Sequence, residues 1–210
     1  MALLAFAALA VSVQAGWTQA LDVRLLLAIG ESRPLWATRI MRVASVLGSG
    51  AVEVPLGLLI SLQLAKIRRR REAGGYAAAV LSGWALYALA KLAFRRARPH
   101  VISRLMHGAG WYAFPSGHAM LAPLVFGLGA LIWAAPWPRR RRAALLAAAV
   151  LSLLIAYSRV YLGMHWPTDA VGGLLLGTGW AGLWMWWWER SARARGQIGR
   201  DIEKVELTAR

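Results

Sequence analysis

Long apolar runs alternate with short polar stretches along most of this 210-residue chain. Most of the runs approach the roughly 20 residues that a helix needs to cross the hydrocarbon core of a bilayer. The pattern therefore predicts membrane-spanning helices, and it places them at residues 47–66, 75–94, 117–135, 143–160 and 168–188.

The N-terminal run, residues 1–15, is apolar but short for a span. Its end, Val13-Gln14-Ala15, resembles the cleavage site of a signal peptide, although no basic segment precedes the run. We therefore expect a retained first helix, with a cleaved signal as the open alternative. Residues 18–46 carry arginines at helical spacing among apolar side chains, which is typical of an amphipathic helix in the membrane interface.

These elements predict an all-α fold, a polytopic membrane helix bundle of about six transmembrane helices plus an interfacial amphipathic segment. We expect a single membrane-embedded domain over residues 1–195 and a polar cytoplasmic tail over 196–210. Hydrophobic residues make up 59% of the chain, well above the usual share for a soluble protein. The chain has no cysteine, which excludes disulfides, thiolate catalysis and cysteine-bound metals.

The net charge is +16, and much of it lies in three arginine clusters. They are Arg68–Arg71, Arg139–Arg142 and the group Arg190, Arg193 and Arg195. If each apolar run crosses once, all three fall on one side, which the positive-inside rule makes cytoplasmic. The sidedness favours topology over nucleic-acid binding as the cause of the charge. We expect a multi-pass inner-membrane protein that binds no nucleic acid.

Three polar stretches then face the periplasmic or extracellular side. The first, residues 91–99, contains Lys91 and Arg98, seven residues apart. Seven residues make about two turns of a helix, so on one helix both cations would point the same way. Pro99 disfavours helical geometry at Arg98, so we expect the helix to end there. Lysine supplies a point charge and arginine a planar fork that grips two phosphate oxygens. Taken alone, such cations more often only reach out of the membrane.

The second stretch, residues 115–118, precedes an apolar helical run. Ser116 suits the N-cap position, and Gly117 allows close approach of the backbone. The amides at a helix start bind anions, and His118 would lie beside a bound anion in the first turn. A histidine at a helix start is more often structural than catalytic, although histidine is also the commonest general acid or base.

The third stretch, residues 158–169, contains Arg159, His165 and Asp169. Asp169 follows His165 by four residues, so its carboxylate can accept a hydrogen bond from one imidazole nitrogen. Such a bond fixes the tautomer and leaves the other nitrogen free as a nucleophile. Alone, the pair could equally be a helix start with an interfacial ion pair. A purely structural explanation of all three stretches would require three independent coincidences on the same face of the membrane.

The combined pattern K-x6-R-P, P-S-G-H and S-R-x5-H-x3-D resembles the type-2 phosphatidic acid phosphatase superfamily, in its integral-membrane, six-helix form. The match has no departure in its motifs, which cover the chain from about residue 91 to 169. The resemblance implies that His165 attacks phosphorus and forms a phosphohistidine. It implies that Asp169 orients His165 and that His118 protonates the leaving group and then activates water.

The resemblance also implies a set of residues that bind the phosphate oxygens, namely Lys91, Arg98, Ser116, Gly117 and Arg159. No metal or other cofactor is expected, because a two-metal site needs several clustered oxygen or imidazole ligands. On the proposed outer face only Asp22, Glu31, Glu53 and Asp169 are acidic, and no motif groups them with other ligands.

A site at the membrane boundary predicts a lipid phosphate or diphosphate as substrate: undecaprenyl diphosphate, phosphatidic acid or phosphatidylglycerol phosphate. Arg95, Arg96 and Arg104 are further cations near the site, and one of them could hold a second phosphate or contact anionic headgroups. A lipid phosphotransferase or a lipid A-type phosphatase with the same site remains an alternative, as does a non-catalytic binding or transport subunit. The sequence does not reveal the oligomeric state.

Overall fold

The structure is a computed structural model that describes residues 1–107, 110 and 112–208. The side chains of residues 192 and 194–208 are outside the description, and these include Arg195 of the third arginine cluster. Tail residues 209–210 are outside it entirely. The helices are α1 (Ala2–Gln14), α2 (Gln19–Glu31), α3 (Leu35–Leu47), α4 (Gly50–Lys66), α5 (Arg70–Phe94), α6 (Gly117–Ala122), η1 (Pro123–Leu128), α7 (Gly129–Trp133), α8 (Pro138–Tyr161) and α9 (Pro167–Thr208). The described residues contain no strand, in agreement with the predicted all-α class.

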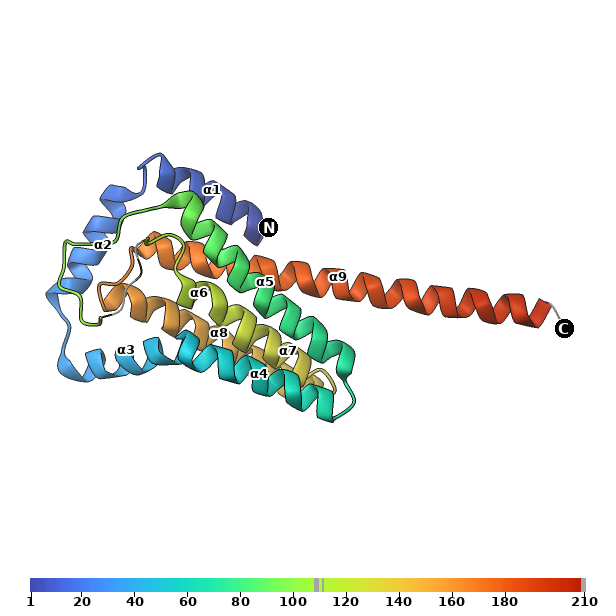
Figure 1. The fold of residues 1–210 in the computed structure, drawn as a ribbon. Coiled ribbons are helices and arrows are strands. Elements are labelled where there is room, and N and C mark those ends of the chain that lie inside the picture. The colour runs from blue at the N-terminus through green and yellow to red at the C-terminus, as the bar shows by residue number, and fades with distance from the viewer. Residues whose placement is uncertain (108–109, 111, 209–210) are drawn as a thin grey trace.

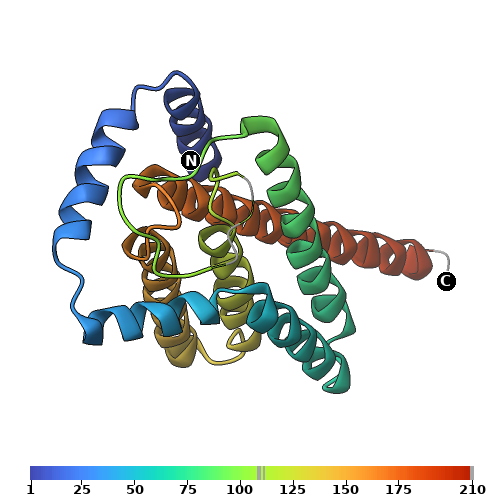
Figure 2. The ribbon, with the colours of Figure 1, turned by 60° about the vertical axis from the view of Figure 1, so that its left-hand side comes forward.

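The helices form a bundle with one long helix projecting from it (Figure 1). α9 packs against α1, α6 and α8 and then continues beyond the bundle toward the C-terminus. α2 lies across the opposite end and contacts both α8 and α9 (Figure 2). The segment expected as a polar tail therefore begins inside a continuous helix, which runs to Thr208.

Among the described residues, α5 and α8 are each long and apolar enough to cross a membrane. Two bent pairs pass the same test together: α1 with α2, bent by 93°, and α3 with α4, bent by 47°. The helices from Gly117 to Trp133 form a shorter apolar segment. The apolar helices agree with a membrane bundle, while the expected count of six crossings stays a prediction.

Residues 18–46 do not form the one amphipathic helix that we expected. The chain forms α2 and α3 instead, separated by an extended Ser32 and by Pro34, which precedes the first residue of α3. Proline has no N–H to donate and disfavours helical geometry in the residue before it, so the helix stops there. The break lets α2 turn across the end of the bundle, where Asp22 and Leu26 are buried.

The expected helix over residues 117–135 is also interrupted. α6 passes into the π-helical turn η1 at Pro123, and α7 follows directly. Proline removes a helical hydrogen bond and clashes with the preceding turn, and a π-turn is one way to accommodate that change. The path of the segment stays continuous (Figure 1), so His118 still lies at its start.

Two glycines of α9, four residues apart, allow α6 to approach its backbone closely. A Cβ atom on Gly173 would lie 2.5 Å from the carbonyl oxygen of Ser116, and one on Gly177 would lie 2.0 Å from that of Met120. Both distances are too short for any side chain. The glycines therefore set the position of the residue 115–118 stretch against the start of α9.

The arginine clusters lie at the end of the bundle opposite to the three polar stretches, as the apolar pattern predicted. Arg69 Nη1, in the connection between α4 and α5, donates to the carbonyl oxygen of Ile132 at 2.9 Å, near the end of α7. Trp188, beside the third cluster, packs against Gly75 in α5. The connections α5–α6 and α8–α9 meet at the other end (Figure 1).

Candidate active site

Lys91 and Arg98 converge on the same region, although not from one helix as we expected. α5 ends at Phe94, and Arg95 adopts a left-handed conformation with φ of 46°. The chain beyond it is extended, so Arg98 belongs to a loop and not to the second turn above Lys91. The prediction that the helix ends at Arg98 was therefore wrong by four residues. The left-handed conformation of Arg95 ends the helix before the chain reaches Pro99.

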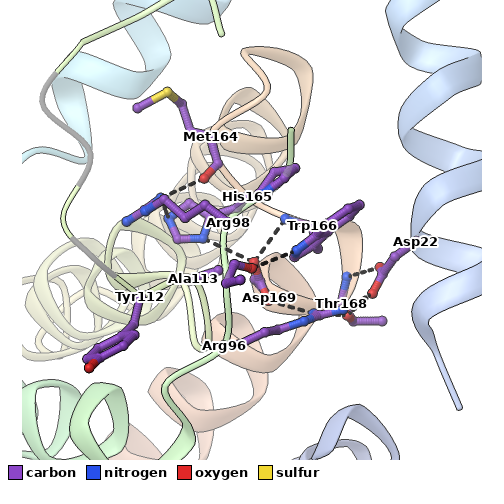
Figure 3. Close-up of polar contacts among 12 residues, drawn as sticks. Asp22, Arg96, Arg98, Tyr112, Ala113, Met164, His165, Trp166, Thr168 and Asp169 are labelled. Carbon is purple, nitrogen blue, oxygen red and sulfur yellow. Dashed lines mark hydrogen bonds and ion pairs between the residues drawn. The ribbon is translucent and has the colours of Figure 1, made fainter. Parts of the chain in front are cut away.

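Both cations donate hydrogen bonds to backbone carbonyls that surround the site. Lys91 Nζ donates to the oxygens of Tyr112 and Ala113, at 2.5 and 2.9 Å. Arg98 donates through Nη1 to the oxygen of Met164 at 2.5 Å and through Nε to that of Gly110 at 2.6 Å. The loop after α5 thus folds back over the two cations, and the guanidinium of Arg98 lies beside His165 (Figure 3).

The residue 115–118 stretch begins α6 as predicted. Ser116 is the N-cap residue, with an extended backbone, and its N–H donates to the carbonyl oxygen of Asp169 at 3.0 Å. Its hydroxyl does not cap the helix, and among the described residues it has no hydrogen-bond partner although it is buried. A Cβ atom on Gly117 would lie 2.7 Å from the ring of Tyr87, so the glycine permits a close contact with α5.

His165 lies in the tight connection between α8 and α9. Gly163 makes this connection possible with φ of +71°, a conformation that other residues rarely adopt. His165 Nδ1 lies 3.3 Å from Asp169 Oδ2, as the four-residue spacing predicted. The other ring nitrogen, Nε2, lies 3.1 Å from Arg98 Nη1 (Figure 3). Arginine can only donate, so the two contacts together favour a proton on Nδ1 and a lone pair on Nε2.

The surroundings of His165 keep its ring neutral. Burial, which leaves the side chain 3% exposed, lowers its pKa well below the usual histidine value, and the charges of Arg98, Lys91 and Arg159 lower the pKa further. A neutral imidazole retains the lone pair that a nucleophile needs. The same three cations would stabilise negative charge on a group that approaches Nε2.

Arg159 and His118 complete the cluster. Arg159 is 5% exposed, near the end of α8, and donates through Nη1 to the hydroxyl of Ser45 on α3. Its Nε has no hydrogen-bond partner in the described part of the chain. His118 lies in the first turn of α6, close enough to Arg159 for the charge of the guanidinium to act on its ring. Every site residue predicted from sequence is therefore found at one end of the bundle.

The sequence analysis missed a buried polar network behind Asp169. Arg96 donates to Asp169 Oδ1 at 2.7 Å and to Asp22 Oδ2 at 2.6 Å. Asp22 also accepts bonds from the backbone N–H and the hydroxyl of Thr168 (Figure 3). The one available signal was an acidic residue four positions before Leu26 on an apolar helix face. The carboxylates on Arg96 leave Arg95 and Arg104 as the cations that could contact a second phosphate.

Comparison with known proteins identifies the family. A model described as the PAP2 superfamily matches residues 72–193, which include all three motif stretches. The chain belongs to this superfamily. A crystal structure of a transmembrane PAP2 type phosphatidylglycerolphosphate phosphatase from Bacillus subtilis is similar, with a TM-score of 0.84 and 26% identity. The similarity covers 90% of this chain and 94% of that one.

Curated relatives within the superfamily differ in how much of their length the chain covers. Phosphatidylglycerophosphatase B from Bacillus subtilis is 28% identical over 177 residues, 82% of this chain and 85% of the relative. An undecaprenyl-diphosphatase from Sulfolobus acidocaldarius is 36% identical over 70 residues, 32% of this chain but only 29% of that protein. For two further relatives the chain spans 33% and 24% of their length. These findings confirm the predicted family and support a membrane enzyme that hydrolyses lipid phosphates.

Proposed function

We propose that this protein is a membrane phosphatase that hydrolyses a lipid phosphate or diphosphate through a phosphohistidine intermediate on His165. One observation carries the proposal. His165 Nδ1 lies 3.3 Å from Asp169 Oδ2, while Nε2 faces the guanidinium of Arg98 at 3.1 Å. A neutral imidazole oriented by a carboxylate, with cations around its free nitrogen, suits attack on phosphorus.

In the first step Nε2 of His165 forms a bond to phosphorus as the bond to the leaving oxygen breaks. His118 in its protonated form, which the negative charge of a bound phosphate would favour, donates a proton to that oxygen, so the lipid alcohol or lipid phosphate leaves in protonated form. Asp169 stabilises the positive charge that develops on the imidazole of His165. In the second step His118 takes a proton from water, which attacks phosphorus, and the bond from His165 breaks to release phosphate.

Five residues would bind the nonbridging oxygens, where charge is spread in the transition state: Lys91, Arg98, Ser116, Gly117 and Arg159. Two of their polar groups support this role. The Ser116 hydroxyl and Arg159 Nε are buried, and within the described residues neither has a hydrogen-bond partner. Buried polar groups are normally paired. A phosphate oxygen would satisfy both, and further oxygens would replace the loop carbonyls that Lys91 and Arg98 contact.

We propose a lipid substrate because the site lies at one end of a bundle of apolar helices, opposite the arginine clusters. Phosphatidylglycerol phosphate is the first candidate, since the relative that matches over most of both chains is a phosphatidylglycerophosphatase. Undecaprenyl diphosphate and phosphatidic acid follow, because the match to an undecaprenyl-diphosphatase covers only 32% of this chain. The arginine clusters favour an inner-membrane protein whose site faces outward.

The test is phosphate release by protein purified in detergent, assayed on the three lipids with a chelator present throughout. We expect release from at least one lipid, and we expect His165→Ala to lose at least about 1,000-fold in kcat because the nucleophile is gone. His118→Ala should keep the first step for substrates with a good leaving group and accumulate acid-labile phosphoenzyme. His100→Ala, an exposed histidine in the same loop region, is the matched control.

The outcomes separate the alternatives. A wild type that releases no phosphate would indicate a binding subunit, whereas phosphate appearing on a second lipid would indicate a phosphotransferase. Activity that disappears with the chelator and returns with a divalent cation would contradict the metal-free mechanism. A His165→Ala variant as active as the His100→Ala control would overturn the assignment of the nucleophile.

A further inference from the structure

Asp22 is a fully buried carboxylate on α2, 143 positions before the catalytic histidine in sequence. Its Oδ1 accepts a bond from the backbone N–H of Thr168 at 2.9 Å, and its Oδ2 accepts one from the Thr168 hydroxyl at 2.6 Å. Thr168 is in the first turn of α9, where backbone N–H groups have no partner within the helix. Asp22 therefore supplies, from another helix, the acceptor that a capping residue usually provides.

Arg96 joins this carboxylate to the one that contacts His165. Its Nη2 donates to Asp22 Oδ2 at 2.6 Å, and its Nη1 donates to Asp169 Oδ1 at 2.7 Å. The arginine side chain is 10% exposed and both aspartates are 0% exposed. The planar guanidinium also lies over the ring of Trp166, 5.5 Å from its centroid. One rigid fork thus spans two buried carboxylates, a geometry that lysine cannot reproduce.

The bridge divides the two oxygens of Asp169 between two tasks. Oδ1 accepts from Arg96, while Oδ2 accepts from the Trp166 backbone N–H at 2.9 Å and faces His165 Nδ1 at 3.3 Å. With Oδ1 held, the carboxylate cannot rotate freely about its last torsion, and Oδ2 stays directed at the imidazole (Figure 3).

Charge points to the same role. Asp22 and Asp169 carry two negative charges and Arg96 one positive charge, so the network holds a net charge of −1. Attack by His165 on phosphorus would convert the neutral ring to a cation. The network then balances that cation, whereas two buried carboxylates without the arginine would repel each other at the start of α9.

We propose that Asp22 and Arg96 are positioning residues for the phosphoryl transfer: Arg96, held by Asp22, orients Asp169 so that Oδ2 faces His165. The inference rests on the proposed function, because it assigns a step to His165. It makes α2 part of the site, although α2 precedes the first motif stretch by 60 residues, from Glu31 to Lys91. The competing explanation is that the network only fastens α2 to α9.

A kinetic cycle distinguishes the two explanations. Arg96→Gln and Asp22→Asn are made in the wild type and in Asp169→Asn, and kcat and KM are measured on phosphatidylglycerol phosphate in detergent micelles. Asp22→Asn keeps an acceptor for the Thr168 N–H, so it tests the charge with less risk to folding. Arg24→Gln and Glu31→Gln, both exposed on α2, are the matched controls. Melting temperature in detergent reports whether each variant is folded.

A positioning role predicts a selective loss. We expect Arg96→Gln to lower kcat about 100-fold, the scale of a misplaced catalytic group, with KM changed less than about threefold. Asp22→Asn should lower kcat by about 10-fold, because Arg96 remains but loses its anchor. In the Asp169→Asn background the same substitutions should lower kcat by less than about threefold, since the carboxylate that Arg96 orients is already lost.

Other results would overturn the inference. If kcat of folded Arg96→Gln stays within about twofold of the wild type, or if the losses are equal in both backgrounds, the network only holds the helices together. If Arg96→Gln fails to fold, the same two criteria apply to Asp22→Asn. Failure of the proposed function is separate: it would appear as an inactive wild type, or as a His165→Ala variant with wild-type kcat.

Discussion

The imidazole of His165 is kept neutral by burial and by three neighbouring cations, and this has a consequence for stability. Its pKa in the folded protein lies well below the 6.5 of an ordinary histidine. As the pH falls below 6.5, the unfolded chain binds a proton at this position while the folded chain does not. Each pH unit then costs about 1.4 kcal/mol of stability until the lower, folded pKa is reached.

We therefore predict that acid destabilises the wild type more than His165→Asn, which cannot titrate at that position. Melting temperatures in detergent, measured from about pH 7.5 to about pH 5, should fall further for the wild type as the pH drops below the usual histidine pKa. His100→Asn, at an exposed histidine, should follow the wild type. Parallel curves for the wild type and His165→Asn would show that the ring titrates normally.

Which site residues the sequence could predict depended on how local their contacts are. His165 and Asp169 are four residues apart, so one helix start brings them together. Asp22 and Arg96 meet Asp169 only because α2 and the loop after α5 fold over the same end of the bundle. No local spacing in the sequence encodes such a contact. From sequence alone, Arg96 was therefore interpreted as a further cation that could hold a second phosphate.

At the level of elements, the site depends on how closely α6 packs against α9. The carbonyl oxygens of Ser116 and Met120 approach the helix where Gly173 and Gly177 have no side chain. A methyl group at Gly173 would lie 2.5 Å from the Ser116 oxygen, so the start of α6 would have to move. The Ser116 N–H, which bonds to the Asp169 carbonyl, and the adjacent His118 would move with it.

We predict that Gly173→Ala lowers the stability by about 1–3 kcal/mol, the usual cost of overpacking, and lowers kcat as well. Gly182→Ala on the same helix is the control, because a Cβ atom there would have no neighbour within 4 Å. Alanine is a better helix former than glycine, so the stability of this variant should equal that of the wild type or exceed it by up to about 1 kcal/mol. Melting in detergent and phosphate release check both. Equal behaviour of the two variants would mean that the contact does not hold the site.

The helix pattern was predictable to the extent that hydrophobicity alone decides it. The runs at 75–94 and 143–160 correspond to α5 and α8, which within the described part of the chain are the two single helices long and apolar enough to span. Breaks within the other segments depend on backbone chemistry: Pro34 divides residues 18–46, and Pro123 introduces a π-turn. The end of α5 at Phe94 was not predictable, since it requires an arginine in a left-handed conformation.

At the level of the whole molecule, the arginine clusters and the candidate active site lie at opposite ends of the bundle. Arg69 and Trp188 lie at the end where α4 joins α5 and α7 joins α8, while His165 lies at the other end. The positive-inside rule assigns the arginine-rich end to the cytoplasm. The substrate phosphate would then be processed on the outer surface, and the released phosphate would leave there.

The chain contains no cysteine, so single introduced cysteines can report this orientation without background labelling. His100→Cys lies at the site end and Ala135→Cys in the α7–α8 connection, and both positions are exposed. With the protein expressed in a bacterial inner membrane, a membrane-impermeant maleimide should label His100→Cys in intact spheroplasts, and Ala135→Cys only after lysis. The reverse pattern would turn the site toward the cytoplasm, and the lipid would then have to be a cytoplasmic-leaflet phosphate. Labelling of both positions in intact spheroplasts would contradict a single orientation.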